Sequence, residues 1–175
     1  MRSFSASMLA LAMTFLLCAC VSNAPVWETV DDELPLPVSA RAPSSIVFAA
    51  PDGTVCQSFA DTGTPQVYAA PDGSYEITAC VLPTVDADAA IEQLTGFDAE
   101  RVEKVATTRF SLPAYAFAWS AAGDEGTRVY RAELLCDESF CYALCFSVPA
   151  GSGTKYDSIQ DAVFASFGLN HDENF

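Results

Sequence analysis

Five cysteines downstream of residue 50 are the residues best suited to chemistry: Cys56, Cys80, Cys136, Cys141 and Cys145. Their odd number allows at most two disulfides and leaves one thiol over. If residues 137–140 form a turn, Cys136 and Cys141 lie opposite one another on paired strands, where a cross-strand bridge could form. Cys56 and Cys80 each follow a Pro-Asp-Gly sequence and could form a second bridge if their strands are neighbours.

A zinc site is the alternative interpretation of these thiols. Structural zinc takes four thiolate or imidazole ligands. Cys136, Cys141 and Cys145 would need Cys80 or Cys56 as the fourth ligand, their spacing is loose, and no histidine lies nearby. The sequence therefore favours a disulfide with buried thiols, and we expect neither a metal nor a cofactor.

Catalytic motifs are absent from the sequence. The single histidine, His171, lies in a charged tail, where a solvated end is the simpler interpretation. No serine-hydrolase, zinc-protease or phosphate-loop motif occurs. The 23 acidic residues leave a surface hydrolase with a carboxylate pair as the alternative function, because sequence spacing does not fix the separation of two carboxylates. Asp86 and Asp88 could hold calcium, but the other ligands of an EF-hand loop are missing and helix capping explains them.

The amino-terminal residues have the three parts of an export signal. Arg2 supplies the positive end, an apolar run extends from Met8 to Leu17, and Ala19 is the small residue before the cleavage point. Polarity returns at Ser22, so the run is shorter than the ~20 apolar residues that span a bilayer. The sequence predicts cleavage rather than a transmembrane helix.

The stretch Leu17-Cys18-Ala19-Cys20 resembles the lipobox of bacterial lipoproteins. Cys20 follows a small residue, as lipoprotein signal peptidases require, whereas Cys18 follows a bulky one. The resemblance implies a diacylglyceryl thioether on Cys20, a further acyl chain such as palmitate on its amine, and a location in the bacterial cell envelope facing outside the cytoplasm. Two or three chains hold far better than one, since each buried methylene contributes about 0.8 kcal/mol.

The chain is strongly acidic, with 8 Lys and Arg against 23 Asp and Glu. Cleavage before Cys20 would remove Arg2 and no acid, which takes the formal net charge from −15 to −16. Such a surface repels phosphate backbones, so nucleic acid is excluded as a partner. It also repels anionic headgroups, so we expect the lipid on Cys20 to hold the protein on the membrane. The remaining partner is an unidentified protein or small molecule.

Composition divides the chain into four parts: a signal peptide over 1–19, a Pro-rich acidic tether over 20–43, a single domain over 44–170, and a charged tail over 171–175. Within the domain, Phe48-Ala49-Ala50-Pro51-Asp52-Gly53 recurs as Tyr68-Ala69-Ala70-Pro71-Asp72-Gly73. Pro presets the first turn position and Gly takes the left-handed conformation that follows. Each copy therefore predicts a β-hairpin, the first joining 46–49 to 54–59 and the second joining 67–69 to 74–82.

Further strands are expected over 102–110, 114–121, 127–136 and 141–148, with breaks at Leu112-Pro113, at 122–124 and at 137–140. A first helix should begin at Asp86 or Asp88, end at Gly96, and bury Ala89, Ala90, Ile91 and Leu94. A final helix should be capped by Asp157 or Ser158 and bury Ile159, Ala162, Val163, Phe164 and Phe167.

A domain of about 130 residues can bury one core, and we expect an α+β fold in which two helices pack on an antiparallel sheet. This order of elements, closing with Phe146-Ser147-Val148-Pro149, a Gly-rich loop and a helix ending in Ala-Ser-Phe-Gly-Leu, resembles the PsbP-like and Ran-binding MOG-type sandwich. A cystatin-like sheet wrapped on one helix is the alternative. The resemblance implies a fold and a bias towards binding or scaffolding, because those families share no catalytic residues.

The expected function is therefore a non-catalytic binding or assembly domain. Such a domain should group exposed aromatic residues on one sheet face, with Tyr115, Trp119 and Tyr142 as the candidates. Strand alternation places Tyr115, Phe117 and Trp119 on the same face, so these rings could instead fill the core.

Overall fold

The computed structural model describes residues 42–57, 65–123 and 126–170 of the 175-residue chain. All of them belong to one compact unit, Arg41–Phe175. The predicted signal peptide, the lipidation site Cys20, most of the tether and the tail with His171 lie outside the described residues. None of the described helices is long and apolar enough to cross a membrane.

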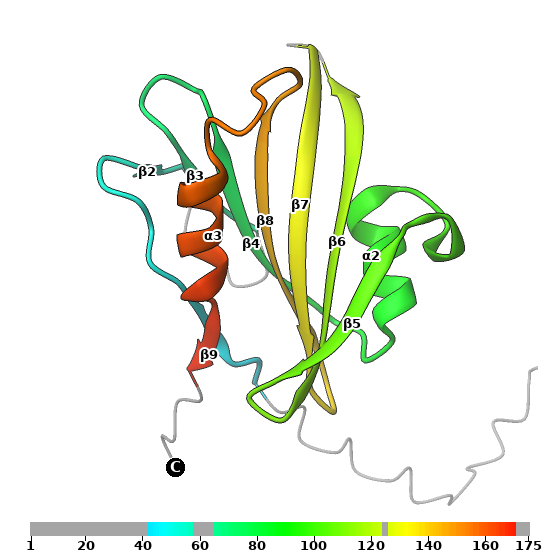
Figure 1. The fold of residues 1–175 in the computed structure, drawn as a ribbon. Helices are drawn as coiled ribbons and strands as arrows, with labels where there is room; N and C mark the ends of the chain where they lie inside the picture. Colours follow the sequence, from blue (N-terminus) through cyan, green and yellow to red (C-terminus); the bar gives the residue numbers. More distant parts are fainter. Residues whose placement is uncertain (1–41, 58–64, 124–125, 171–175) are drawn as a thin grey trace, which may run out of the picture. The chain divides into compact units, whose positions relative to one another are not determined.

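The central element is an antiparallel sheet (Figure 1). Successive side chains along each strand point to opposite faces of the sheet. Its strands, in spatial order, are β2 (Val55–Cys56), β3 (Gln66–Ala69), β4 (Glu76–Leu82), β8 (Cys141–Pro149), β7 (Gly126–Cys136), β6 (Leu112–Gly123) and β5 (Lys104–Arg109). A separate small sheet pairs β1 (Ser45–Val47) with β9 (Gly168–Asn170). The strand β8 is buried on both faces, which explains its nearly continuous apolar sequence.

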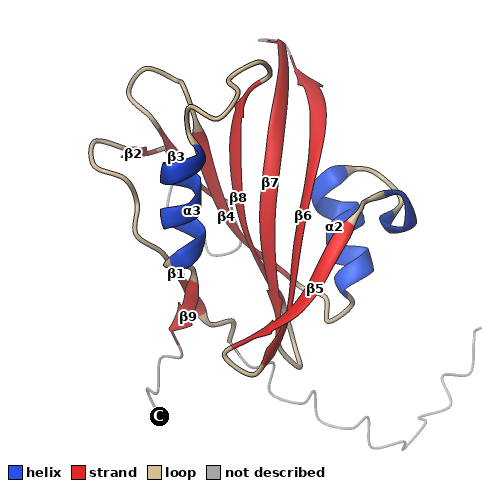
Figure 2. Cartoon of the chain, viewed as in Figure 1, coloured by secondary structure: helices blue, strands red, loops and turns tan. Residues whose placement is uncertain are grey.

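Two helices lie on opposite faces of the sheet (Figure 2). The helix α2 (Ala87–Thr95), followed by the short 3₁₀ helix η1 (Ala99–Arg101), packs Ala90 and Ile91 on the face that contains Cys141, Ala143 and Cys145. The helix α3 (Asp157–Ala165) packs Val163 and Phe164 on the face that contains Tyr142, Leu144 and Phe146. The predicted α+β class is therefore confirmed, and the cystatin-like alternative with one helix is wrong.

The helix termini match the sequence prediction at α2 and differ at α3. Asp86 caps α2 by accepting a hydrogen bond from the Asp88 N–H, and Gly96 ends it with a φ of 72°. The residue that caps α3 is Tyr156, without a side-chain bond, so the prediction of Asp157 or Ser158 is wrong. Asp157 is instead the first helical residue, where its charge still favours the helix dipole.

In each helix, one alanine that was predicted to be buried is exposed. Ala89 of α2 and Ala162 of α3 are exposed, whereas the larger apolar residues predicted beside them are buried or half-buried. Alanine is too small to distinguish the edge of an apolar stripe from its centre.

The first Pro-Asp-Gly turn does not make the predicted hairpin. Gly53 has the expected positive φ of 82° and the Thr54 N–H reaches the Pro51 carbonyl, so the turn itself forms. The strand before it, β1, pairs with β9, and the strand after it, β2, pairs with β3. Ile46 and Phe48 pack against the α3-side core, which draws β1 away from its neighbour in sequence. The second copy makes the predicted β3–β4 hairpin.

The predicted break at Leu112-Pro113 is also wrong. Both residues belong to β6, and the chain reverses one step earlier at Phe110 and Ser111, whose φ angles are 53° and 65°. Pro113 is tolerated because β6 begins to pair with β7 only at Ala114, so the missing proline N–H breaks no ladder bond with β7.

Candidate functional site

A column of stacked aromatic rings stands on the α2 side of the sheet. Trp119 of β6 lies directly opposite Tyr130 of β7. Their ring centroids are 4.8 Å apart with an interplanar angle of 10°, and Phe117 also stacks on Trp119, with centroids 5.6 Å apart and an interplanar angle of 24°. Phe117 is buried, whereas Trp119 and Tyr130 are half-buried, so the column passes from the core to the surface.

Arg128 extends the same face beyond the rings. It lies two residues before Tyr130 on β7, and its Nε and Nη2 donate to the Ser147 hydroxyl at 3.2 and 3.0 Å. Nη2 also donates to the Ser147 carbonyl at 3.1 Å, which fixes the guanidinium against β8. We call Trp119, Arg128, Tyr130 and Ser147 the aromatic face. The ends of β6 and β7 extend past both helices (Figure 1).

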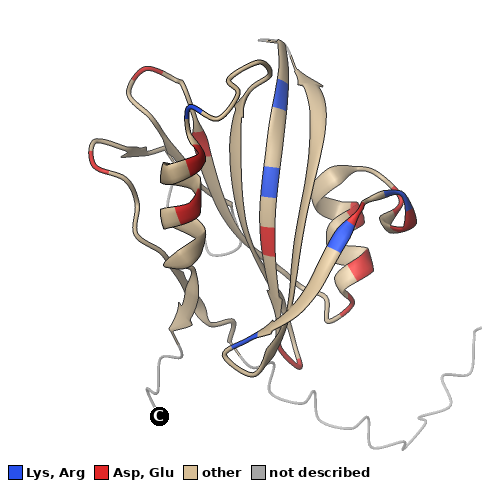
Figure 3. Ribbon diagram, in the orientation of Figure 1, with Lys and Arg blue, Asp and Glu red and all other residues tan. Residues whose placement is uncertain are grey.

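The chemistry available at the aromatic face is non-covalent recognition. Ring edges and faces supply apolar and stacking contacts, and a guanidinium supplies directed hydrogen bonds and positive charge. A positive group is notable on so acidic a protein. Asp and Glu occur on both helices, whereas Lys and Arg lie on β5, on β7, at the end of η1 and in a loop (Figure 3).

The three predicted binding aromatics do not lie together. Tyr115 and Trp119 are half-buried on the α2 side and pack against its core, whereas Tyr142 is fully buried on the α3 side. The Tyr142 hydroxyl donates to Asp137 Oδ2 at 2.9 Å and accepts from the Ser44 N–H at 3.1 Å. Burial raises the pKa of Tyr142 above its usual range. Its prediction as a binding residue is therefore wrong, because its position on β8 points to the opposite face.

Cys136 and Cys141 form a disulfide, with their Cα atoms 4.1 Å apart on directly opposed strand positions. The turn between them is held by Asp137, whose Oδ1 accepts hydrogen bonds from the N–H groups of Ser139 and Phe140 at 2.7 Å. The second predicted bridge, between Cys56 and Cys80, does not form. Cys56 is on β2 and Cys80 on β4, so β3 separates them by two strand spacings, beyond the ~7 Å that a disulfide can span.

The two other cysteines of the sheet, Cys80 and Cys145, are buried on the α2 side. Burial raises the pKa of the Cys80 thiol to about 11. Burial, with a smaller effect of the neighbouring Cys80, also raises the pKa of Cys145. Both thiols are therefore protonated near neutral pH, which makes them poor nucleophiles and poor metal ligands. Cys136 and Cys141 share the same face, but their sulfurs are bonded to one another.

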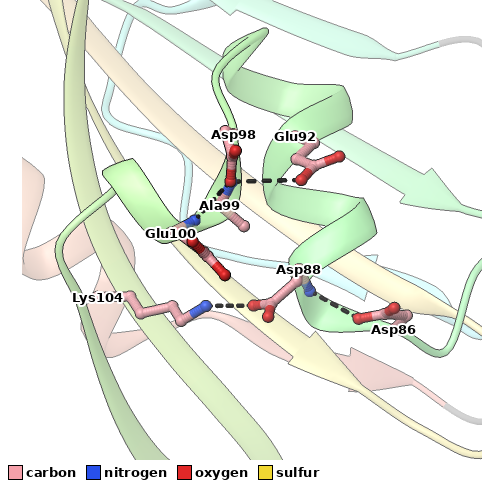
Figure 4. Close-up of polar contacts among 7 residues, drawn as sticks. All are labelled: Asp86, Asp88, Glu92, Asp98, Ala99, Glu100 and Lys104. Atoms are coloured by element: carbon pink, nitrogen blue, oxygen red, sulfur yellow. Dashed lines mark hydrogen bonds and ion pairs between the residues drawn. The ribbon is translucent and has the colours of Figure 1, made fainter.

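The acidic residues around α2 hold the fold together rather than converging on a ligand (Figure 4). Asp86 caps α2, and Asp88 forms an ion pair with Lys104 of β5. In the same cluster, Glu92 accepts from the Ala99 N–H at 3.3 Å and Asp98 caps η1. In the described part of the chain, no group of three or more His, Cys, Asp or Glu residues is placed to hold a metal ion.

Sequence reasoning missed Tyr130 and Arg128. A signal for Tyr130 was available, because a hairpin that pairs Gly123 with Gly126 places residue 130 opposite Trp119. The contact of Arg128 with Ser147 depends on the β7–β8 pairing and a long side chain, which carry no local sequence signal.

No family model and no curated protein matches this sequence. Solved structures do match. The PsbP protein CyanoP of Synechocystis sp. PCC 6803 has a TM-score of 0.51 at 16% identity, covering 71% of this chain and 86% of that chain. LpqN of Mycobacterium tuberculosis, described as involved in cell envelope biogenesis, has a TM-score of 0.50 at 15% identity, covering 74% and 86%.

A protein of Bacteroides thetaiotaomicron VPI-5482 has a TM-score of 0.50 at 12% identity over 73% of this chain. The match spans less than half of that protein, 46% of its length. The likeness to CyanoP shows that the predicted PsbP-like arrangement of sheet and helices is the fold of this chain.

Proposed function

We propose that this protein is a lipid-anchored, extracytoplasmic binding or assembly domain without catalytic activity. The lipobox-like residues Leu17-Cys18-Ala19-Cys20 support the anchor. The shared fold with LpqN, a protein involved in cell envelope biogenesis, supports a place in the envelope. The acidic surface suits a solvated domain that is held near a membrane by lipid.

The observation that carries the binding role is the aromatic face. The Trp119–Tyr130 stack is half-exposed and lies beside a guanidinium that Ser147 orients. Partly exposed aromatic residues and Arg are enriched where proteins bind partners, because they offer large apolar area with little side-chain entropy to lose. A partner with a stacking or apolar group and a hydrogen-bond acceptor would fit this face.

A catalytic role is less well supported by the described groups. The thiols of Cys80 and Cys145 are buried and protonated, and Glu133 and Asp161 are paired with Arg109 and Arg131. General acid–base or nucleophilic catalysis needs such groups to be accessible and poised near the working pH.

Site-specific photo-crosslinking in the native host tests the binding role. Trp119 is replaced by p-benzoylphenylalanine, and the matched control carries the same residue at Ala118, which is exposed on the opposite face of β6. We expect one dominant crosslinked product from position 119 and none from 118. The product should disappear when Tyr130→Ala is added. Equal products from both positions, or insensitivity to Tyr130→Ala, would contradict binding at the aromatic face.

A further inference from the structure

The turn between β5 and β6 has a costly backbone that local sequence does not favour. Phe110 and Ser111 both have positive φ, 53° and 65°. This is the conformation of a type I′ turn, which strongly prefers Asn-Gly. A bulky residue with positive φ is rare and raises the energy of the folded state.

Burial of the Phe110 ring does not offset the cost of this backbone conformation. Its side chain is 67% exposed, the highest value among the exposed large hydrophobic residues that the structure describes. One edge of its ring lies near Gly168, and the Arg109 guanidinium is 5.2 Å from the ring centroid. Phe110 is therefore mostly exposed to solvent, on a turn whose backbone is strained.

Two shallow grooves flank this turn. The first, of about 510 Å³, is mostly apolar and is lined by Phe110, Val47 and Leu169. The second, of about 540 Å³ on the other side, is more polar, because Asp137 and Glu138 line it beside Val85 and Pro113. Leu112 lines both. Val47 is 43% exposed and Val85 is 57% exposed. We call Val47, Val85, Phe110, Leu112 and Leu169 the apolar end.

The chain enters the domain at this end. The Ser44 N–H donates to the Tyr142 hydroxyl, which also binds Asp137 in the β7–β8 turn, and Val47 lines the first groove. About 24 residues separate Cys20 from Ser44, so even a fully extended chain between them reaches no more than about 80–86 Å. With Cys20 anchored in lipid, a tether of that length would keep the domain near the membrane, where a weak contact is enough.

We propose that the apolar end is the surface with which the domain contacts the interfacial region of the lipid bilayer. The proposal rests on the lipid anchor of the proposed function. Phe is one of the residues by which peripheral proteins insert at the headgroup boundary, and moving the exposed area of Phe110, Val47 and Val85 out of water is favourable. The domain's negative charge opposes anionic headgroups, so the contact is expected on zwitterionic lipid and weaker on anionic lipid.

Fluorescence quenching by brominated lipid tests the contact. The acylated protein is reconstituted in phosphatidylcholine vesicles, and acylation is verified by the mass of its amino-terminal peptide. Phe110→Trp is compared with Phe97→Trp, a site 40% exposed just after the far end of α2 from Val85. We expect brominated lipid to quench the emission added by Phe110→Trp at least twofold more than that added by Phe97→Trp, after subtraction of the wild-type signal.

A double variant separates the membrane contact from a structural role. Phe110→Asn with Ser111→Gly gives the turn the residues that it prefers, so its melting temperature should equal or exceed that of the wild type. Hydrogen exchange at residues 105–115 should slow on vesicles in the wild type and not in the double variant. Equal quenching at both tryptophan sites, or vesicle protection retained by the double variant, would overturn the contact alone. A chain without acyl groups would overturn the anchor as well.

Discussion

Arg109 offers the sharpest test of how this fold is held together. Its Nη1 donates to Glu133 Oε2 at 2.9 Å and to the Phe164 carbonyl at 2.8 Å, and its Nη2 donates to the Ala165 carbonyl at 2.7 Å. The last two acceptors belong to the final turn of α3, and the Phe164 carbonyl also accepts from the Phe167 N–H at 3.2 Å. One side chain thus joins β5 to β7 and to the end of α3.

Arg109→Met should lower the free energy of unfolding by about 2–4 kcal/mol. The side chains of Arg109 and Glu133 are only 24% and 22% exposed, so the change leaves a carboxylate poorly hydrated and without its cation. Two helix carbonyls also lose a charged donor, at roughly 1 kcal/mol each. For a domain of this size the melting temperature should fall by roughly 8–15 °C. Urea titration followed by circular dichroism measures the free energy directly.

Arg131→Met is the matched control, because Arg131 pairs with Asp161 at 3.1 Å but the two side chains are 42% and 67% exposed. Its cost should stay below about 1 kcal/mol. Adding Glu133→Gln to Arg109→Met should recover about 1–2 kcal/mol, since the isolated carboxylate is gone. Equal costs for the two arginine variants, or no recovery in the double variant, would refute the reasoning.

Three other outcomes are expected. Cys20→Ser should abolish incorporation of a fatty-acid analogue while the domain stays folded, and labelling as strong as in the wild type would exclude Cys20 as the acceptor. Tyr142→Phe should destabilise the domain by about 1–3 kcal/mol in a urea titration, because the buried hydroxyl no longer bonds Asp137 and the Ser44 N–H; an unchanged midpoint would contradict this. Because the folded-state pKa of Cys80 is about 11 against an ordinary 9.0, the unfolded chain loses this proton first, and stability should fall as pH rises from about 9 to 11. Cys80→Ala should reduce that fall, and an identical alkaline profile would be evidence against it.

Features set by nearby residues were predictable from the sequence. Asp86 and Gly96 delimit α2 because capping and the left-handed end are local properties. Both Pro-Asp-Gly turns form as predicted, but only the second one joins paired strands, so turn residues determine the chain reversal and not the strand pairing. The β1–β9 pairing could not be predicted, because it depends on Ile46 packing against a core that α3 completes. The turn at Phe110 was missed because its residues contradict the usual preference for its conformation.

The candidate site was half predictable. Trp119 was named as a possible exposed aromatic residue, and alternation along β6 correctly placed it on one face with Tyr115 and Phe117. Tyr142 was wrongly grouped with it, although Cys141 and Tyr142 are adjacent on β8 and must face opposite ways. The Cys136–Cys141 disulfide lies on the α2 side of the sheet, so Tyr142, the next residue along β8, must lie on the α3 side. Arg128 remained hidden because its partner Ser147 is reached through tertiary structure.

The β1–β9 sheet also governs the order in which the domain can be completed. A chain is synthesised from its amino terminus, so β1 is among the first described strands to emerge and its partner β9 is the last. Pairing that waits for the end of the chain closes a very long loop, which slows folding and leaves the early strand exposed in the meantime. A nascent or truncated chain that stops before Gly168 would therefore expose Ile46, which is half-buried in the complete domain, to solvent and to folding factors. It would also lack the wall of the first groove that β9 supplies.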